Sequence, residues 1–300
     1  MVTSSRRGTL LAVGETMAMV APADGSVADA DEFLVDAGGA ESNVAAHVAA
    51  LGHDSRWFSR LGDDALGRRV AGQLVERGVD VSSVIFDAVH PTGLYVKDPG
   101  RGVVYYRRGS AASHLTALDA DGVSFDGVDV VHVSGITAAI SDTAAGFLDR
   151  LIDRARRAGV IVSIDVNHRP VLWAPGEAAR ALDALARRAD ILFTGRDEAE
   201  ALWATATDED IRRHFPEVGE LIVKDGEIGA TVFAGGARVF EPSHRVDVVD
   251  AVGAGDAFAG GYLAALLTAL PPNGRLRSGH ARAALTLQTV GDSIDGRVLK

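Results

Sequence analysis

The stretch RVDVVDAVGAGDAFAGGYLAALL, residues 245–267, is the part of the chain that decides the fold. Its first residues alternate in polarity and predict a short strand, and a glycine-rich turn at residues 252–256 leads into an apolar run of helical length. A helix N-terminus after such a turn favours anions, because its free amides and its dipole face the ligand. Asp256 lies where these amides converge, so its carboxylate is suited to accept a proton from an alcohol while the amides stabilise a phosphoryl group.

A purely structural interpretation of the same turn is also open. Asp is a common residue at the start of a helix. Gly253 and Gly255 suit any sharp turn that precedes one. The turn alone therefore leaves a catalytic centre and an ordinary helix start as alternatives, and the pattern of the remaining chain has to be weighed with it.

Length and composition allow one large α/β domain or two smaller ones. A chain of 300 residues with 47% hydrophobic residues buries a large core, and we expect one domain over residues 1–300. The charge of −11 and the pI near 5.2 argue against nucleic acid or an anionic membrane as the main partner. The absence of cysteine excludes disulfides and favours a cytoplasmic protein. No stretch approaches the roughly 20 apolar residues that cross a bilayer.

The first third of the chain predicts short strands and two helices. Residues 9–13 form a buried type of strand that ends at Gly14-Glu15, where a parallel sheet delivers side chains to a ligand. The other expected elements are brief strands at 17–20 and 33–35 outside the main sheet, strands at 57–60 and 84–86, and helices at 44–51 and 64–77.

A hairpin is predicted between residues 93 and 108, from two alternating runs around a five-residue loop at 98–102. Tyr95, Tyr105 and Arg107 lie in these runs, although only 6% of all residues are aromatic. Hydroxyl donors, flat rings and a guanidinium suit a polar, anionic ligand such as a carboxylate. Tyrosines also pack well in strands and arginines are usually solvated, so a purely structural hairpin is the alternative.

From residue 129 onward strands and helices alternate, which implies a doubly wound, mostly parallel sheet with helices on both faces. Residues 165–170, DVNHRP, follow one strand, so their polar side chains emerge at the edge where such sheets bind ligands. Arg169 is therefore a candidate for binding a substrate anion, with a surface ion pair as the alternative. The expected elements are strands at 130–135, 160–167, 190–195 and 221–224, and helices at 143–157, 177–188, 196–203 and 276–288.

Several of these stretches resemble the ribokinase-like (PfkB) carbohydrate kinases. DAVGAGDAFAGG resembles the C-terminal signature of that family and GGAESNVAAHVAALG its N-terminal signature, while HVSGITAAIS and KDGEIGA occur in family order between them. The resemblance implies a ribokinase-like fold with a small β-strand lid, formed by the discontinuous segments 15–37 and 92–112.

The resemblance also implies roles for named residues. Asp256 is implied as the catalytic base, with the amides of Gly253, Ala254 and Gly255 as the anion hole. On the sugar side the implied residues are Gly38, Gly39, Asn43, Tyr95, Tyr105, Arg107 and Arg169, together with Asp292, whose Gly-Asp pair is otherwise an ordinary turn.

For the nucleotide side the resemblance implies ATP and Mg²⁺ as cofactors, and it leaves room for a monovalent cation such as K⁺. Glu198 matches a Glu that helps to position hydrated magnesium, although Gly195 replaces the usual Asn three residues earlier. The loop KDGEIG resembles a nucleotide loop and is also an ordinary turn between strands. The implied nucleotide residues are Asn167, Lys224, Gly226, Gly229, Gly253, Gly255 and His280, the last standing where relatives tend to have Asn.

Two stretches are similar to one subgroup of the family. VYYRRGSA and DVNHRPVLW resemble the 2-keto-3-deoxygluconate kinases, in which a lid Tyr and Arg and the Arg of D-x-N-x-R hold the carboxylate and keto oxygen of the sugar acid. The implied reaction is ATP-dependent phosphorylation of the terminal C6 hydroxyl, giving the 6-phosphate.

Two alternatives stay open at this point. One is a sibling kinase for fructose, ribose or another sugar acid; the other is a non-catalytic sugar-binding protein on the same fold. In each case the partners are small molecules. Exposed edge strands in the lid predict a homodimer or higher homo-oligomer.

Overall fold

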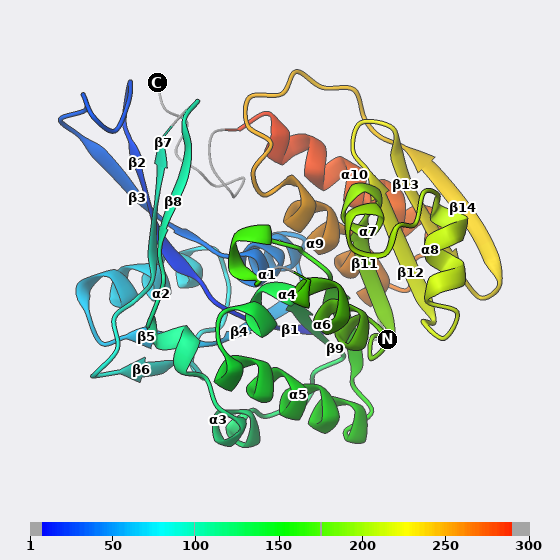
Figure 1. Cartoon of the computed structure of the whole chain (residues 1–300), viewed down its shortest axis with the longest axis horizontal. Helices are drawn as coiled ribbons and strands as arrows, with labels where there is room; N and C mark the ends of the chain where they lie inside the picture. The colour runs from blue at the N-terminus through cyan, green and yellow to red at the C-terminus, as the bar shows by residue number, and fades with distance from the viewer. Residues whose placement is uncertain (1–7, 99, 175, 290–300) are drawn as a thin grey trace, which may run out of the picture.

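The computed structural model describes residues 8–98, 100–174 and 176–289, and its centre is an eight-stranded sheet (Figure 1). The strand order is β14-β13-β12-β11-β10-β9-β1-β4. The strands from β12 to β4 run parallel, and β13 and β14 continue the sheet antiparallel. The predicted mostly parallel sheet is therefore confirmed. Its strands are β1 (Thr9–Val13), β4 (Asp54–Phe58), β9 (Val130–Ser134), β10 (Ile161–Asp165), β11 (Ile191–Gly195), β12 (Glu220–Asp225), β13 (Gly229–Ala234) and β14 (Ala237–Pro242).

Helices cover both faces of this sheet because alternate residues of its strands enter two separate cores. Leu11 and Val13 of β1 enter one core, whereas Leu10 and Ala12 enter the other. Both faces are buried, so the strands are apolar throughout rather than alternating. Facing the first core are α3 (Ala117–Gly122), α4 (Gly135–Ala139), α5 (Asp142–Arg157), α6 (Glu177–Ala186), α7 (Arg196–Trp203) and α8 (Asp208–His214); facing the second are α1 (Ala40–Ala50), α2 (Ala65–Glu76), α9 (Ala254–Leu267) and α10 (Pro272–Leu287).

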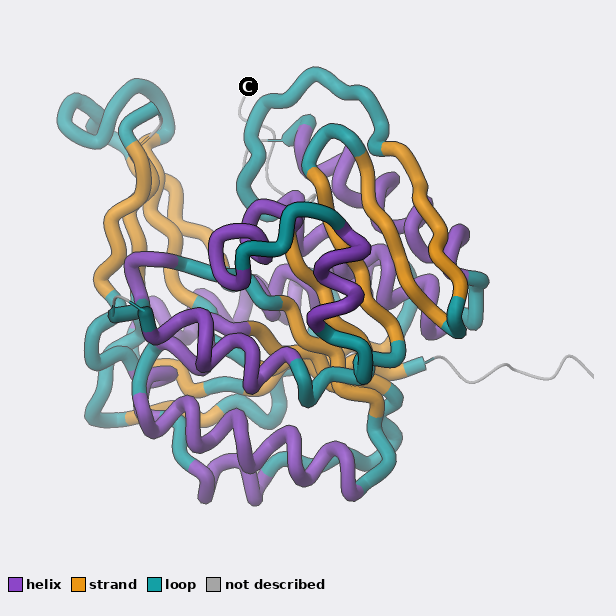
Figure 2. Tube along the Cα trace, turned by 45° about the vertical axis from the view of Figure 1, so that its right-hand side comes forward, coloured by secondary structure: helices purple, strands orange, loops and turns teal. Residues whose placement is uncertain are grey.

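A second, four-stranded sheet with the order β3-β2-β7-β8 stands to one side of the main sheet, and we call it the small sheet. Figure 2 shows its strands rising beside the helical layers. Strands β2 and β7 pair parallel and the outer pairs are antiparallel. This sheet confirms the strands that were predicted outside the main sheet. Its strands are β2 (Met17–Pro22), β3 (Phe33–Gly38), β7 (Leu94–Asp98) and β8 (Gly102–Tyr106), and β5 (Arg60–Gly62) pairs separately with β6 (Ile85–Asp87).

Several local predictions were wrong, among them the start of α10, which begins at Pro272 instead of residue 276. The strand expected at the start of residues 245–267 is a loop, because the amides of Val249 and Asp250 donate to Leu287 O instead of to a strand. The hairpin loop is shorter than five residues, since Asp98 still pairs with Gly102. Helix α1 begins before the predicted residue 44, and this places Asn43 inside the helix.

No helix in the part of the chain that the structure describes is both long enough and apolar enough to cross a membrane.

His47 and His132 are buried histidines that are held in the uncharged form. His47 of α1 is 1% exposed, and burial together with the nearby cations of Arg282 and Arg77 lowers its pKa to about 3. Arg282 Nε donates to His47 Nδ1 over 2.9 Å. Burial likewise lowers the pKa of His132 in β9 to about 4. Both side chains therefore stay neutral at pH values at which an unfolded histidine, with a pKa near 6.5, takes up a proton.

We expect the free energy of unfolding to fall as the pH drops below about 6.5. At these pH values the histidines of the unfolded chain bind protons, whereas the two buried histidines of the folded protein do not. Each histidine contributes up to about 1.4 kcal/mol per pH unit until the folded pKa is approached. Urea unfolding of the wild type and of His47→Gln at pH 7, 6 and 5 measures this, and the variant should show the flatter pH dependence. His244→Gln, at an exposed position, is the control. Equal pH dependence in the wild type and His47→Gln would contradict the assignment.

Candidate active site

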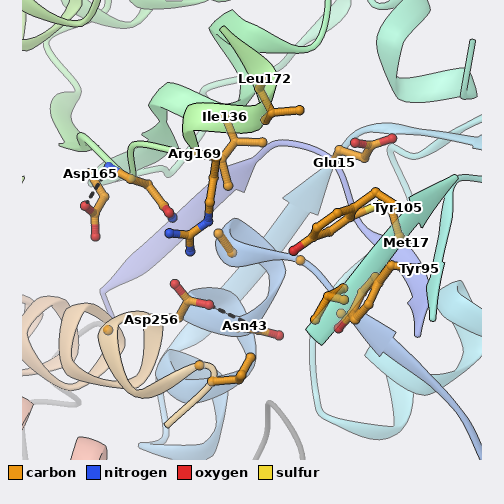
Figure 3. Close-up of a pocket in the computed structure, with 18 of the residues that line it drawn as sticks. Glu15, Met17, Asn43, Tyr95, Tyr105, Ile136, Asp165, Arg169, Leu172 and Asp256 are labelled. Carbon is orange, nitrogen blue, oxygen red and sulfur yellow. Dashed lines mark hydrogen bonds between the residues drawn. The ribbon is translucent and has the colours of Figure 1, made fainter. Parts of the chain in front are cut away.

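A cavity of about 560 Å³ lies at the carboxyl edge of the main sheet, between that sheet and the small sheet (Figure 3). Parallel strands all end at this edge, so side chains that follow them converge there. Glu15 follows β1, Asp165 ends β10, Gly195 ends β11 and Lys224 lies near the end of β12. The small sheet supplies the opposite wall through Tyr95 and its neighbours. The predicted convergence of polar groups at the strand ends is therefore seen.

Asp256 lies in the first turn of α9, where the positive end of the helix dipole stabilises an ionised carboxylate. Its Oδ2 accepts a hydrogen bond from Asn43 Nδ2 over 2.9 Å, which Figure 3 marks. Gly253 precedes the helix with a φ of 79°, a left-handed conformation that glycine adopts without strain. Gly253, Gly255 and Asp256 line the cavity. The turn thus presents backbone and a hydrogen-bonded carboxylate to one space.

Gly38 and Gly39 are required by close packing around the cavity. A methyl group at Gly38 would lie 2.1 Å from Tyr95 Oη, and one at Gly39 would lie 2.5 Å from Glu15 O. The rings of Tyr95 and Tyr105 lie 5.7 Å apart and both line the cavity. The glycine pair therefore lets the small sheet approach the N-terminus of α1.

Arg107, just after β8, forms an ion pair with Glu15 at the end of β1. The Glu15 side chain is only 1% exposed, and Ser110 Oγ donates a hydrogen bond to its other carboxylate oxygen. Arg107 also lies 5.9 Å from the centre of the Tyr105 ring. Its positive charge is therefore largely compensated within the protein, a partnership that was not predicted.

Arg169 differs from Arg107 in its surroundings. Its side chain is exposed, lines the cavity and, among the residues that the structure describes, takes part in no ion pair. Figure 3 shows its guanidinium pointing into the cavity on the side of Asp256. The backbone beside it is fixed by Asn167, which has a φ of 42°, and by a hydrogen bond from His168 N to Glu198 Oε1 of 3.0 Å. The predicted alternative of a surface ion pair for Arg169 is not seen.

A second group of charges lies beside the α9 turn. Lys224 Nζ is 2.8 Å from Asp165 Oδ2. Burial by itself lowers the pKa of Lys224, but the carboxylates of Asp165 and Glu198 outweigh it and raise that pKa, so the ammonium stays charged. A methyl group at Gly255 would lie 3.7 Å from Lys224 Nζ, which places this charge beside the α9 turn.

Glu198 does not present a free carboxylate to the cavity. Its Oε2 accepts from Gly195 N over 2.7 Å, and its Oε1 accepts from His168 N over 3.0 Å. A side chain at Gly195 would meet Asp197 Oδ1 at 2.6 Å, so Asp197 occupies the space that an Asn would fill. Asp197 also lines the cavity, as Glu198 does.

Three predicted residues are not among those that line the cavity. Gly229 starts β13, and a methyl group there would collide with Glu241 O at 2.4 Å. His280 is buried on α10, with its Nε2 3.1 Å from Glu241 O. Ala254 opens α9 beside the cavity. Asp292 lies outside the described residues. The predicted residues that do line it are Gly38, Gly39, Asn43, Tyr95, Tyr105, Arg107, Asn167, Arg169, Glu198, Lys224, Gly226, Gly253, Gly255 and Asp256.

Several residues of the cavity were missing from the predicted site. Lys97 follows Tyr95 by two positions in β7 and therefore shares its face, a signal that the alternating hairpin carried. Asp197 adjoins the predicted Glu198 in sequence, and Asp165 belongs to the stretch 165–170 whose polar side chains were predicted at this edge. Ile136 has no polar signal, and only its place after β9 pointed to the cavity.

Comparison with known proteins agrees with this geometry. A family model described as pfkB family carbohydrate kinase matches residues 8–296. The chain is 38% identical over 294 residues to 2-dehydro-3-deoxygluconokinase of Bacillus subtilis strain 168, covering 94% of this chain and 90% of that protein. It is 33% identical over 296 residues to 2-dehydro-3-deoxygalactonokinase of Haloferax volcanii, covering 94% and 92%.

Among solved structures, 2-dehydro-3-deoxygluconokinase from Thermotoga maritima superposes with a TM-score of 0.87 at 26% identity, covering 96% of this chain and 95% of that one. The family match spans nearly the whole chain and includes both the α1 and the α9 turns of the cavity. The chain therefore belongs to the pfkB family of carbohydrate kinases.

Proposed function

We propose that this protein phosphorylates the C6 hydroxyl of 2-keto-3-deoxygluconate, also called 2-dehydro-3-deoxygluconate, with ATP as the donor. One observation carries the proposal: the guanidinium of Arg169, which forms no ion pair among the described residues, and the carboxylate of Asp256 face the same cavity. A sugar acid has an anionic end for the first and a terminal hydroxyl for the second. The relatives that act on such acids support the assignment.

Asp256 is the proposed base. It removes the proton of the terminal hydroxyl as that oxygen attacks the γ-phosphorus in line, and ADP leaves. Asn43 orients the carboxylate through the hydrogen bond to its Oδ2. The amides of Gly253, Ala254 and Gly255 stabilise the negative charge of the transferring group, as helix N-termini do for anions.

The sugar acid is proposed to bind with its carboxylate on Arg169. A guanidinium matches a planar carboxylate with two parallel hydrogen bonds. Tyr95, Tyr105 and Arg107 are left to donate to the keto and hydroxyl oxygens, because the charge of Arg107 is compensated by Glu15. A neutral sugar such as fructose or ribose would leave Arg169 without an anion, which disfavours the sibling kinases.

ATP and Mg²⁺ belong to the same proposal. Lys224 lies beside the α9 turn and is the proposed contact for phosphate, and Gly226 and Asn167 line the same cavity. Magnesium takes oxygen ligands and usually keeps several waters. The carboxylates of Asp197 and Glu198 fit an ion held through water and phosphate oxygens, where it would neutralise charge on the transferring group. A role for Gly229, His280, Asp292 or a monovalent cation such as K⁺ stays a prediction.

The small sheet is the proposed lid of a single ribokinase-like domain, and it is also the proposed oligomer contact. Its outer strands β3 and β8 carry exposed apolar side chains: Phe33 is 43% exposed, Leu34 39%, Val104 55% and Tyr106 61%. Unpaired edges with apolar faces favour pairing with a second copy, giving a homodimer or higher homo-oligomer. An ATP-consuming sugar kinase suits a cytoplasmic location.

Asp256→Asn should lower kcat by roughly 10²- to 10⁴-fold, because the amide keeps the shape of the base but cannot take the proton. The KM for either substrate should change little. Coupled detection of ADP measures the rate, and Asp247→Asn, an exposed position on the same stretch, should behave as wild type. A variant Asp256→Asn that turns over at the wild-type rate would exclude Asp256 as the base.

Arg169→Ala should raise the KM for 2-keto-3-deoxygluconate by about 10- to 100-fold, since charge-assisted hydrogen bonds of about 1.5–3 kcal/mol are lost. Arg169→Lys keeps the positive charge but loses the two parallel N–H donors of the guanidinium. Its KM should lie between those of the wild type and Arg169→Ala. The assay panel is 2-keto-3-deoxygluconate, 2-keto-3-deoxygalactonate, gluconate, fructose and ribose, with Arg180→Ala, exposed on α6, as control. Preference of the wild type for fructose or ribose would overturn the sugar-acid proposal.

Val104→Asp should shift the protein from dimer towards monomer at micromolar concentration, because it places a desolvated charge in the proposed contact. Light scattering measures the mass of both proteins. A monomeric wild type, or a variant of unchanged mass, would remove the small sheet as the oligomer contact.

A further inference from the structure

Lys97 and Asp250 form an ion pair that joins the small sheet to the loop before α9. The residues are 153 positions apart, and their side chains are 18% and 17% exposed. Lys97 lies two residues after Tyr95 in β7 and, like it, lines the cavity. The ammonium therefore reaches across from the sugar-side wall to the side that carries the anion-binding turn.

The two carboxylate oxygens of Asp250 have different partners. Oδ2 meets the ammonium of Lys97, and Oδ1 accepts a hydrogen bond from Val252 N over 3.0 Å. Val252 directly precedes Gly253, whose left-handed conformation starts α9. The carboxylate thus connects a charge on the small sheet to the backbone turn that presents the amides.

Among the residues that the structure describes, the loop that carries Asp250 has few other supports. It is not a strand, and Val248 and Val249 are 60% and 59% exposed. The amides of Val249 and Asp250 share one acceptor, Leu287 O, at 2.8 and 3.4 Å. A loop held by so few contacts takes its conformation from them, so the ion pair with Lys97 has a large share in fixing the turn.

Another ion pair joins the small sheet to the main body, and it is more deeply buried than the pair of Lys97 and Asp250. Glu15 and Arg107 pair at its base with 1% and 11% exposed side chains. Lys97 and Asp250 are more exposed, so water competes for them and their pair can break while the base stays fixed. The less buried pair is the one suited to open and close.

We propose that Lys97 and Asp250 are a latch: their ion pair holds the small sheet over the cavity and at the same time orders residues 250–253. Closure over the sugar and formation of the anion hole then occur together, which limits transfer of phosphate to water. Both residues act as positioning residues through the turn and make no contact with the reacting atoms. The inference rests on the proposed kinase function and adds a coupling between its two substrate sites.

The test is a double-mutant cycle with Lys97→Met and Asp250→Asn. The first keeps the length of the side chain without its charge, and the second keeps an oxygen for Val252 N. Arg101→Met, in the same hairpin and 62% exposed, removes an equal charge as control. Rates of phosphate transfer to the sugar acid and of ATP hydrolysis without sugar are measured for all variants, together with hydrogen exchange of the amides at 251–255 and the midpoint of thermal unfolding.

Each single variant should raise the KM for the sugar acid about fivefold to tenfold, the size expected for a partly buried ion pair. Each should also increase hydrolysis relative to transfer and speed exchange at 251–255, with an unchanged unfolding midpoint. The double variant should be no worse than the poorer single variant. Arg101→Met should match the wild type in every measurement.

Three results would overturn the latch. The first is a double variant in which the fold-changes of the two single variants multiply, and the second is a Lys97→Met variant in which only the KM for ATP changes. The third is hydrogen exchange of the amides at 251–255 that stays at the wild-type rate in the variants. Failure of the proposed substrate looks different, because the wild type would then phosphorylate no sugar acid of the panel. Hydrogen exchange and sugar-free hydrolysis need no sugar, so they decide on the latch in that case too.

Discussion

Helices α1 and α9 come very close at Gly260, and the arrangement of the cavity depends on that approach. A methyl group there would lie 2.5 Å from His47 Cβ, so any larger residue would push the helices apart. Their approach brings Asn43 Nδ2 to 2.9 Å from Asp256 Oδ2 although the two residues are 213 positions apart. Close backbone packing therefore fixes the position of α1, which carries Asn43, relative to α9, which carries the proposed base. The hydrogen bond between Asn43 and Asp256 adds to a contact that packing has already set.

The positive charges that line the cavity differ in whether a carboxylate compensates them. In a protein with a charge of −11, a cation that is left uncompensated attracts an anionic ligand locally. Among the described residues that line the cavity, Arg169 is the cation with no ion pair, and it lies on the side of the proposed base. The cations with carboxylate partners are Lys97 with Asp250, Arg107 with Glu15, and Lys224 with Asp165.

Much of the fold followed from local pattern, because buried parallel strands and amphipathic helices leave clear periodicities; α7 at Arg196–Trp203 is an example. The strand predicted at 245–249 failed because alternation of polarity cannot tell whether a neighbouring strand is available. The site was predictable where polar residues follow strands, as at Arg169. The partner of Arg107 was not, since Glu15 lies on another element and only tertiary packing unites them. His280, a position taken from resemblance, is buried on α10 with its Nε2 3.1 Å from Glu241 O, and no local pattern indicated that burial.

Arg169 stands on a short segment between β10 and α6, and it belongs to neither of the two hydrophobic cores. Its guanidinium makes no ion pair in the described structure, so no fold-supporting contact of that kind depends on it. A substitution at Arg169 can consequently change ligand binding without changing the residues of the two cores, on which the stability of the fold depends. A lineage built on this scaffold can exchange one sugar for another by substitutions in such segments, while the strands that feed both cores remain as they are.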